Sequence, residues 1–182
     1  MIRIVLLSFY IFAAFIRAEA QPVNIEKVRD QYFSMDKTVD GALKLYKVLE
    51  KADLSKDPVL LAYRGASSAA SAESVSGVRT KLEYFNRGKT ELEKAVSLKK
   101  LDPEIRFLRL ATQVNAPGFL GYTGEIKNDK SIIFTTLISV AANHPNAYLY
   151  HRICKFMLTY TELNASEKAT VNQLINKFTP EK

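Results

Sequence analysis

The stretch DPVLLAYRGASSAASAESVSGVRTKLEYFNRGKTELEKAVSLKKLDP, residues 57–103, decides the fold. It begins and ends with an Asp-Pro pair, and each pair is a helix start. The aspartate oxygen caps free backbone N–H groups, and proline is tolerated at the first helical position. Apolar residues recur at helical spacing on both sides of the polar loop 74–77. The stretch therefore predicts a helical hairpin, with a further helix beginning at Pro103.

The second helix of this hairpin alternates small and large side chains. Gly88, Leu92 and Ala95 stand at intervals of four and three, so neighbouring helices can approach closely. In this respect residues 57–103 resemble the tetratricopeptide repeat (TPR). Such repeats stack into solenoids with extended binding surfaces, so the resemblance implies interaction rather than catalysis.

A second likeness involves the segment that follows. The order of Ala95-Val96, then DPEIRFLR at 102–109, then PGFLGY at 117–122 is similar to that in a group of small exported bacterial proteins. This likeness implies export and a helical fold, and it implies no activity.

Apolar residues recur at spacings of three and four along almost all of the remaining chain, and strand patterns are scarce. We therefore predict an all-α protein whose antiparallel hairpins pack as a short TPR-like α-solenoid, with a closed helical bundle as the alternative. Residues 86–88 mark a candidate break, because glycine weakens a helix interior. The expected helices cover residues 24–33, 38–52, 58–72, 78–99, 103–116, 125–143, 145–162 and 165–178.

Residues 65–72, GASSAASA, form a run of uniformly small side chains on the expected third helix. Two interpretations are open. The run permits tight contact with a neighbouring helix, or it leaves a shallow groove that a ligand or partner can fill. The second interpretation makes this face the floor of a binding site.

Residues 1–20 have the layout of a cleavable secretory signal, with Arg3 before an apolar run and small residues at Ala18 and Ala20. The run covers residues 4–16 and is shorter than the roughly 20 residues that a membrane-spanning helix needs. An uncleaved anchor is the competing interpretation. We expect a secreted or periplasmic protein without stable membrane insertion, whose residues 21–182 form a single all-helical domain.

The formal net charge is +7, and removal of Arg3, Arg17 and Glu19 with the signal leaves +6. Basic and acidic residues alternate, and no basic run is longer than Lys99-Lys100. Nucleic-acid binders concentrate their basic residues, so we expect no nucleic acid as a partner. A solvated surface or attraction to an anionic envelope surface accounts for the excess.

Catalytic and metal-binding patterns are scarce. Cys154 and His151 share a helix face, and an imidazole can activate a thiol, but a buried structural cysteine is the simpler interpretation. Two histidines and one cysteine do not provide the spacing of a zinc site. We expect no enzyme activity, no metal and no cofactor.

The strongest candidate for partner binding combines charge with an apolar loop. Arg106 and Arg109 lie one turn apart on the fifth helix. Phe119, Leu120 and Tyr122 follow in a loop that is too hydrophobic to be simply solvated. Alternatively, both arginines pair with internal acids and the loop plugs a gap. The leading hypothesis is a module that binds a protein or peptide of the cell envelope, and the alternative is a domain that binds a small molecule or lipid.

Overall fold

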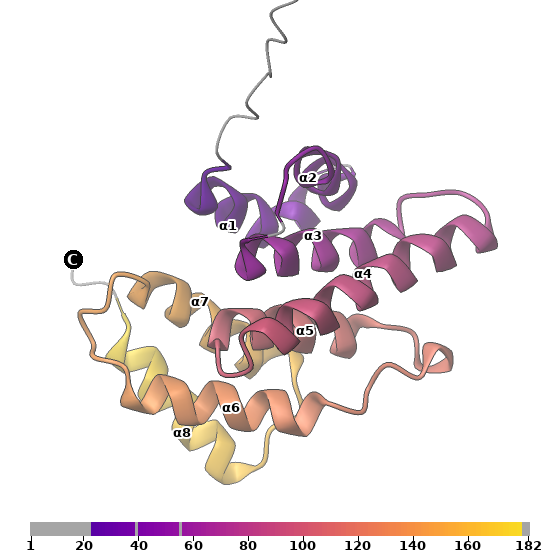
Figure 1. Cartoon of the computed structure of the whole chain (residues 1–182). Coiled ribbons are helices and arrows are strands. Elements are labelled where there is room, and N and C mark those ends of the chain that lie inside the picture. Colours follow the sequence, from indigo (N-terminus) through magenta and orange to yellow (C-terminus); the bar gives the residue numbers. More distant parts are fainter. Residues whose placement is uncertain (1–22, 39, 55, 180–182) are drawn as a thin grey trace, which may run out of the picture.

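The computed structural model describes residues 23–38, 40–54 and 56–179. The predicted signal at 1–20 lies outside these residues. Within them the chain forms eight α-helices and two short 3-10 helices, and no strand (Figure 1), which confirms the all-α prediction. The elements are α1 (Ile25–Phe33), η1 (Met35–Lys37), α2 (Gly41–Glu50), α3 (Pro58–Ser71), α4 (Val78–Leu98), α5 (Pro103–Asn115), η2 (Gly118–Leu120), α6 (Ile126–Ser139), α7 (Ala147–Tyr160) and α8 (Ala165–Lys177).

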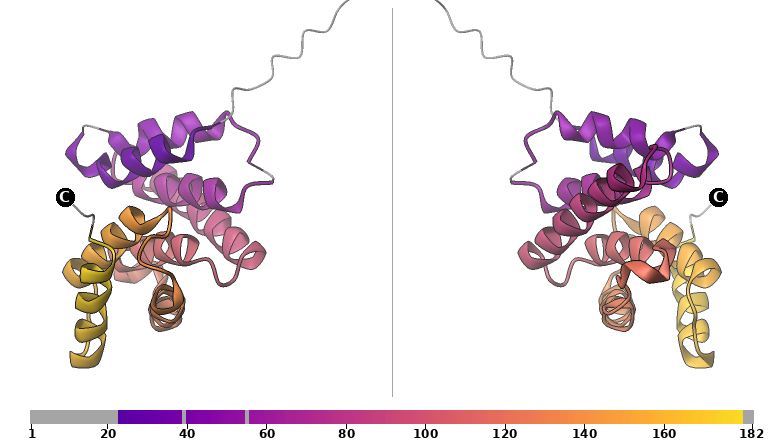
Figure 2. Two further views of the ribbon diagram at one scale, coloured as in Figure 1. Left: turned by 90° about the vertical axis from the view of Figure 1, so that its left-hand side faces the viewer. Right: turned by 90° about the vertical axis from the view of Figure 1, so that its right-hand side faces the viewer.

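Neighbouring helices pack in chain order. Consecutive helices contact each other from α1 to α6, and α7 pairs with α8. Further contacts join alternate helices: α1 to α3, α3 to α5, α5 to α7, and α6 to α8. Two perpendicular views place α1 and α2 at one end of the molecule and α8 at the other (Figures 1 and 2). Helix α3 therefore lies between the N-terminal helices and the pair formed by α4 and α5.

The predicted helix starts are confirmed by their caps. The Asp57 carboxylate accepts hydrogen bonds from the N–H groups of the second and third residues of α3, both at 3.0 Å. Asp102 does the same for α5, at 3.0 and 3.2 Å. Asn164 and Glu167 form a reciprocal capping box at the start of α8. These local signals fix the helix boundaries independently of tertiary packing.

The predicted break at residues 86–88 is wrong, because α4 is continuous from Val78 to Leu98. Gly88 is needed for a close helix crossing. A Cβ atom at Gly88 would lie 2.4 Å from the carbonyl oxygen of Gly65 on α3. The prediction that the sixth helix reaches residue 143 is also too long, since α6 ends at Ser139.

Aromatic side chains from the odd-numbered helices form the centre of the core. The ring of Tyr32 on α1 lies 5.3 Å from that of Tyr63 on α3 and 6.3 Å from that of Phe107 on α5. Phe107 in turn lies 5.2 Å from Phe156 on α7. Edge-to-face contacts of this kind add stability beyond simple burial. The main hydrophobic cluster therefore joins both halves of the molecule, and Ala69, Phe85 and Tyr122 form a second, smaller cluster.

Candidate functional site

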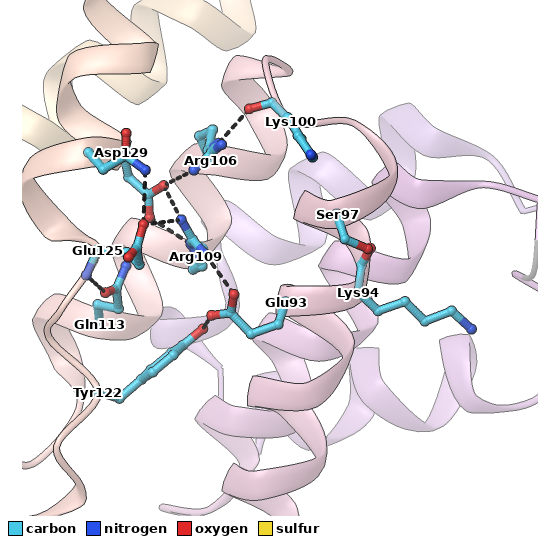
Figure 3. A network of polar contacts seen from close by, with 11 residues as sticks. Glu93, Lys94, Ser97, Lys100, Arg106, Arg109, Gln113, Tyr122, Glu125 and Asp129 are labelled. Atoms are coloured by element: carbon cyan, nitrogen blue, oxygen red, sulfur yellow. Dashed lines mark hydrogen bonds and ion pairs between the residues drawn. The ribbon is translucent and has the colours of Figure 1, made fainter.

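The two arginines of the predicted site lie in the interior. Figure 3 shows both guanidinium groups directed at Asp129 on α6. Arg106 Nη1 lies 2.9 Å from Asp129 Oδ1, and Arg109 donates to both oxygens of the same carboxylate at 2.9 and 2.7 Å. Asp129 is completely buried, and both arginines are at most 5 % exposed. The site is thus an internal ion cluster between α5 and α6.

The polar groups of this cluster are satisfied from within the protein. Gln113 Nε2 donates to Asp129 Oδ2 at 2.9 Å, and Arg106 Nε donates to the carbonyl oxygen of Lys100 at 2.7 Å. Among the described residues, no buried side-chain nitrogen or oxygen lacks a hydrogen-bond partner. Buried charges are tolerated when they are paired and fully hydrogen-bonded. The cluster therefore joins α5 to α6, and its buried polar atoms have their partners inside the protein.

The same cluster anchors the apolar loop. Arg109 Nη1 donates to Glu93 on α4 at 2.7 Å, and the hydroxyl of Tyr122 donates to the other oxygen of Glu93 at 2.7 Å (Figure 3). The Tyr122 ring meets Phe85 edge-on at 5.9 Å. Burial, aided by the hydrogen bond to Glu93, raises the pKa of Tyr122 far above its usual range. The end of the loop is therefore fixed against α4.

The structure thus separates the five residues that the sequence grouped together. Arg106, Arg109 and Tyr122 are buried: Asp129 pairs with both arginines, and Tyr122 packs against Phe85 and donates to Glu93. This arrangement is the internal pairing that the sequence left open as the alternative. Leu120 is half-buried, and Phe119 is 84 % exposed. Only these last two contribute to a surface that a partner can reach.

That surface is one wall of a groove of about 660 Å³. The groove runs from η1 and the start of α2, across the C-terminal halves of α3 and α5, to the start of α4 and the loop at η2. Alanines are the commonest residues of its lining, and those contributed by α3, α5 and the residues just after these helices are called the alanine floor: Ala66, Ala69, Ala70, Ala72, Ala111 and Ala116.

The small-residue run of α3 explains why the groove exists. On one side of α3, Gly65 meets Gly88, and the Ser68 hydroxyl donates to the carbonyl oxygen of Tyr84 at 2.9 Å. On another side, Ala66 and Ala70 line the groove. The interpretation of residues 65–72 as a tight helix contact is therefore confirmed. A groove also lies beside another side of the same helix, and its use as a binding site stays a prediction.

Large apolar side chains border the groove and remain in contact with solvent. Phe119 is 84 % exposed, Val78 is 76 % exposed and Leu82 is 37 % exposed. All three line the groove, although they come from two separate segments of the chain. Large apolar side chains are thus exposed on two segments that border the same groove. The groove therefore combines a concave shape with apolar side chains that remain exposed to solvent.

Sequence reasoning missed the part of the lining that comes from the N-terminal region. Asp36, Thr38 and Asp40 line the groove, as does Glu73 just after α3. No spacing rule connects the residues around 36–40 with those around 66–73, because tertiary packing alone brings these two segments together. The signal that could be recognised was the small-residue run itself.

The cysteine and histidine positions do not form a reactive pair. Cys154 is completely buried, and burial raises the pKa of its thiol to about 12. His151 Nδ1 lies 3.3 Å from the carbonyl oxygen of Ile175. A thiol that stays protonated is a poor nucleophile. In the part of the chain that the structure describes, no cluster of His, Cys, Asp and Glu could hold a metal ion.

Comparisons of the chain with protein-family models, with curated proteins and with solved structures found no match. None of the described helices has the length and apolar character required to cross a membrane. The groove is therefore the feature on which a functional conclusion can be based.

Proposed function

We propose that this protein is an exported helical module that binds a protein or peptide partner, and that the partner occupies the groove beside α3. The observation that carries the proposal is a groove of about 660 Å³ with an alanine floor and exposed apolar walls. Binding sites are typically concave and mostly apolar, with a few polar groups that set orientation. The groove meets this description, and no catalytic constellation competes with it among the described residues.

A peptide suits the groove because its apolar side chains can lie on the alanine methyl groups. Phe119, Val78 and Leu82 would lose their contact with water on binding, which favours association by about 25 cal/mol for each Å² of apolar area covered. Phe119 has two rotatable side-chain bonds, so ordering it costs little entropy. The bound segment would thus be held mainly by apolar contact.

The finer architecture is part of this proposal: a short, curved stack of hairpins that resembles tetratricopeptide repeats, with the groove on its concave face. Contacts between consecutive and alternate helices support a stack. Arg152 on α7 lies 2.8 Å from Asp30 on α1, a contact that a stack of hairpins allows only if it is strongly curved. The same ion pair is also compatible with a closed helical bundle, the alternative fold predicted from the sequence.

Export follows from the sequence of residues 1–20 and belongs to the proposal as well. A signal with Arg3, an apolar run and a small-residue cleavage site directs a protein out of the cytosol. The partner would then be a protein or peptide of the periplasm, the envelope or the surroundings. Sequencing of the mature N-terminus tests this part directly, because residual Met1 would contradict it.

The main test fills the groove. Ala70→Phe places a ring on the floor, and Ala142→Phe, in the α6–α7 connection outside the groove, is the matched control. Phage-displayed peptides are selected on the wild-type protein and then titrated against all three proteins. We expect the selected peptides to bind wild type and Ala142→Phe alike, and to bind Ala70→Phe at least about tenfold more weakly. If the selected peptides bind Ala70→Phe as tightly as wild type, the groove is not their binding site.

The second candidate function, a small-molecule or lipid carrier, rests on the same groove, because its volume lies within the roughly 300–1,000 Å³ that is typical of small-ligand sites. Native mass spectrometry of the protein purified from its own compartment separates the two. A bound lipid that Ala70→Phe removes would favour the carrier. A ligand-free protein that binds the selected peptides would favour the module.

A further inference from the structure

The acidic residues at the groove differ from nearly all other acids of the protein. Most of the other described carboxylates pair with arginine or lysine or cap a helix, as Glu104 and Asp57 do. Among the described residues, the carboxylates that accept no hydrogen bond and form no ion pair are those of Asp36, Asp40, Glu73 and Glu162. Asp36, Asp40 and Glu73 all line the groove.

The charge at the groove is thus opposite to that of the whole chain. Three carboxylates line the groove and Lys81 is its single described basic residue, whereas the full sequence carries a formal charge of +7. The three acids come from separate places: η1, the residue before α2, and the turn that follows α3. Tertiary folding therefore gathers unpaired negative charge around an apolar floor on an otherwise basic protein.

On this basis we propose that the occupant of the groove is a cationic amphipathic peptide segment. This inference rests on the proposed function and adds the charge of the partner. The apolar side chains of the segment lie on the alanine floor and against Phe119, Val78 and Leu82. Its lysine or arginine side chains extend along the apolar walls and place their charged ends beside Asp36, Asp40 and Glu73, since long basic side chains have apolar stems and polar ends.

Electrostatics then gives specificity as well as affinity. Complementary charges raise the association rate and reject partners of the wrong sign. The chain as a whole carries a net positive charge, so the acidic lining of the groove attracts a cationic segment more than the average surface does. At physiological salt the screening length is about 8 Å, so the nearby carboxylates dominate over the distant positive charge.

The test uses two synthetic probes: a fluorescein-labelled peptide that repeats Leu-Lys-Lys-Leu-Leu-Lys-Lys, and the same peptide with glutamine in place of every lysine. Fluorescence anisotropy measures binding to the wild-type protein and to three variants. The first variant combines Asp36→Asn, Asp40→Asn and Glu73→Gln, where asparagine tolerates the left-handed backbone of Asp40 (φ 55°). The second is Glu162→Gln, the matched unpaired acid outside the groove, and the third is Ala70→Phe.

We expect wild type and Glu162→Gln to bind the lysine peptide about tenfold more tightly than the glutamine peptide, since three exposed charge pairs contribute a little over one power of ten together. The triple variant loses this preference, and Ala70→Phe binds neither peptide. Added salt should weaken the binding of the lysine peptide and leave the binding of the glutamine peptide unchanged. The two charge variants add no bulk to the protein, Ala70→Phe adds a ring in the groove, and circular dichroism with thermal melting checks that each variant folds.

The outcomes separate the two proposals. Equal binding of both peptides to wild type, abolished by Ala70→Phe, would refute the charge preference and keep the groove as a binding site. A preference for lysine that survives in the triple variant would also refute the inference, because other residues would then supply the charge. Failure of both peptides to bind wild type would contradict the proposed function together with the inference.

Discussion

The α5–α6 contact and the groove beside α3 both contain acidic side chains, but their surroundings differ. Asp129 is fully buried and accepts hydrogen bonds from Arg106, Arg109 and Gln113. Asp36 and Glu73 lie in the open groove without such partners. At the first place the charge contributes to folding, and at the second it remains available to another molecule.

Apolar residues repeat this contrast within one loop. Tyr122 lies against Phe85 and donates to Glu93, so it holds the loop to α4. Phe119, three residues earlier in the sequence, is 84 % exposed. The Phe119 ring therefore contributes little packing to the fold, and under the proposed function it contacts the partner. The comparison predicts that mutations in the two regions act on different observables, stability in one and binding in the other.

The largest effect is expected for Asp129→Ala. Removal of this carboxylate leaves two buried guanidinium groups without their main partner, which should lower the free energy of unfolding by about 3–5 kcal/mol. Urea denaturation measures the change. Glu73→Ala in the groove is the matched control and should change stability by less than about 0.5 kcal/mol. A small loss of stability for Asp129→Ala, or a large loss for Glu73→Ala, would contradict the claim that the two acids play different roles.

A smaller loss is expected for Gly88→Ala. The added methyl group would lie 2.4 Å from the carbonyl oxygen of Gly65 and 2.6 Å from the backbone nitrogen of Ala69, so α3 and α4 must separate. We expect a net destabilisation of about 1–3 kcal/mol in thermal or urea unfolding, despite the better helix propensity of alanine. Gly118→Ala, where no atom lies within 4 Å of the new Cβ, should be neutral. Unchanged stability in both variants would refute the close crossing.

Tyr122→Phe should cost about 1 kcal/mol, because the ring stays packed and only the hydrogen bond to Glu93 is lost. Hydrogen exchange should also become faster in residues 121–124, since the loop loses one of its anchors. If exchange stays unchanged, the polar network does not hold the loop.

The smallest effect on stability is expected for Phe119→Ser, with a change within about 0.5 kcal/mol. The same substitution should weaken peptide binding clearly, because it removes the most exposed apolar side chain of the groove. Parallel melting and anisotropy measurements separate the two effects. A marked drop in melting temperature would show that Phe119 stabilises the fold after all.

Local chemistry explains which features could be predicted from the sequence. The caps at Asp57 and Asp102 and the box at Asn164 act within a few residues, so their helix starts were predictable. The prediction at Gly88 was wrong, because a glycine is needed there for the close contact with Gly65 on another helix. Glycine inside a helical pattern signals either a break or a close contact, and sequence spacing does not distinguish them.

The candidate site was harder to predict, since it depends on which groups find partners inside the protein. Nothing near Arg109 in the sequence shows that Asp129 will lie beside it. Equally, Asp36 and Glu73 come together at one groove only after α1, α2 and α3 have packed. The run 65–72 was the exception, because uniformly small side chains leave space on any free face of a helix.

The central claim is that a partner lies on the alanine floor of α3, and alanine-methyl NMR tests it most directly. A titration of the ¹³C-methyl-labelled protein with the lysine-containing peptide should shift the methyl signals of Ala66, Ala69 and Ala70. The signals of Ala147 and Ala165, which lie outside the groove, should stay in place. Shifts confined to alanines outside the groove, or no shifts at saturating peptide, would contradict the account.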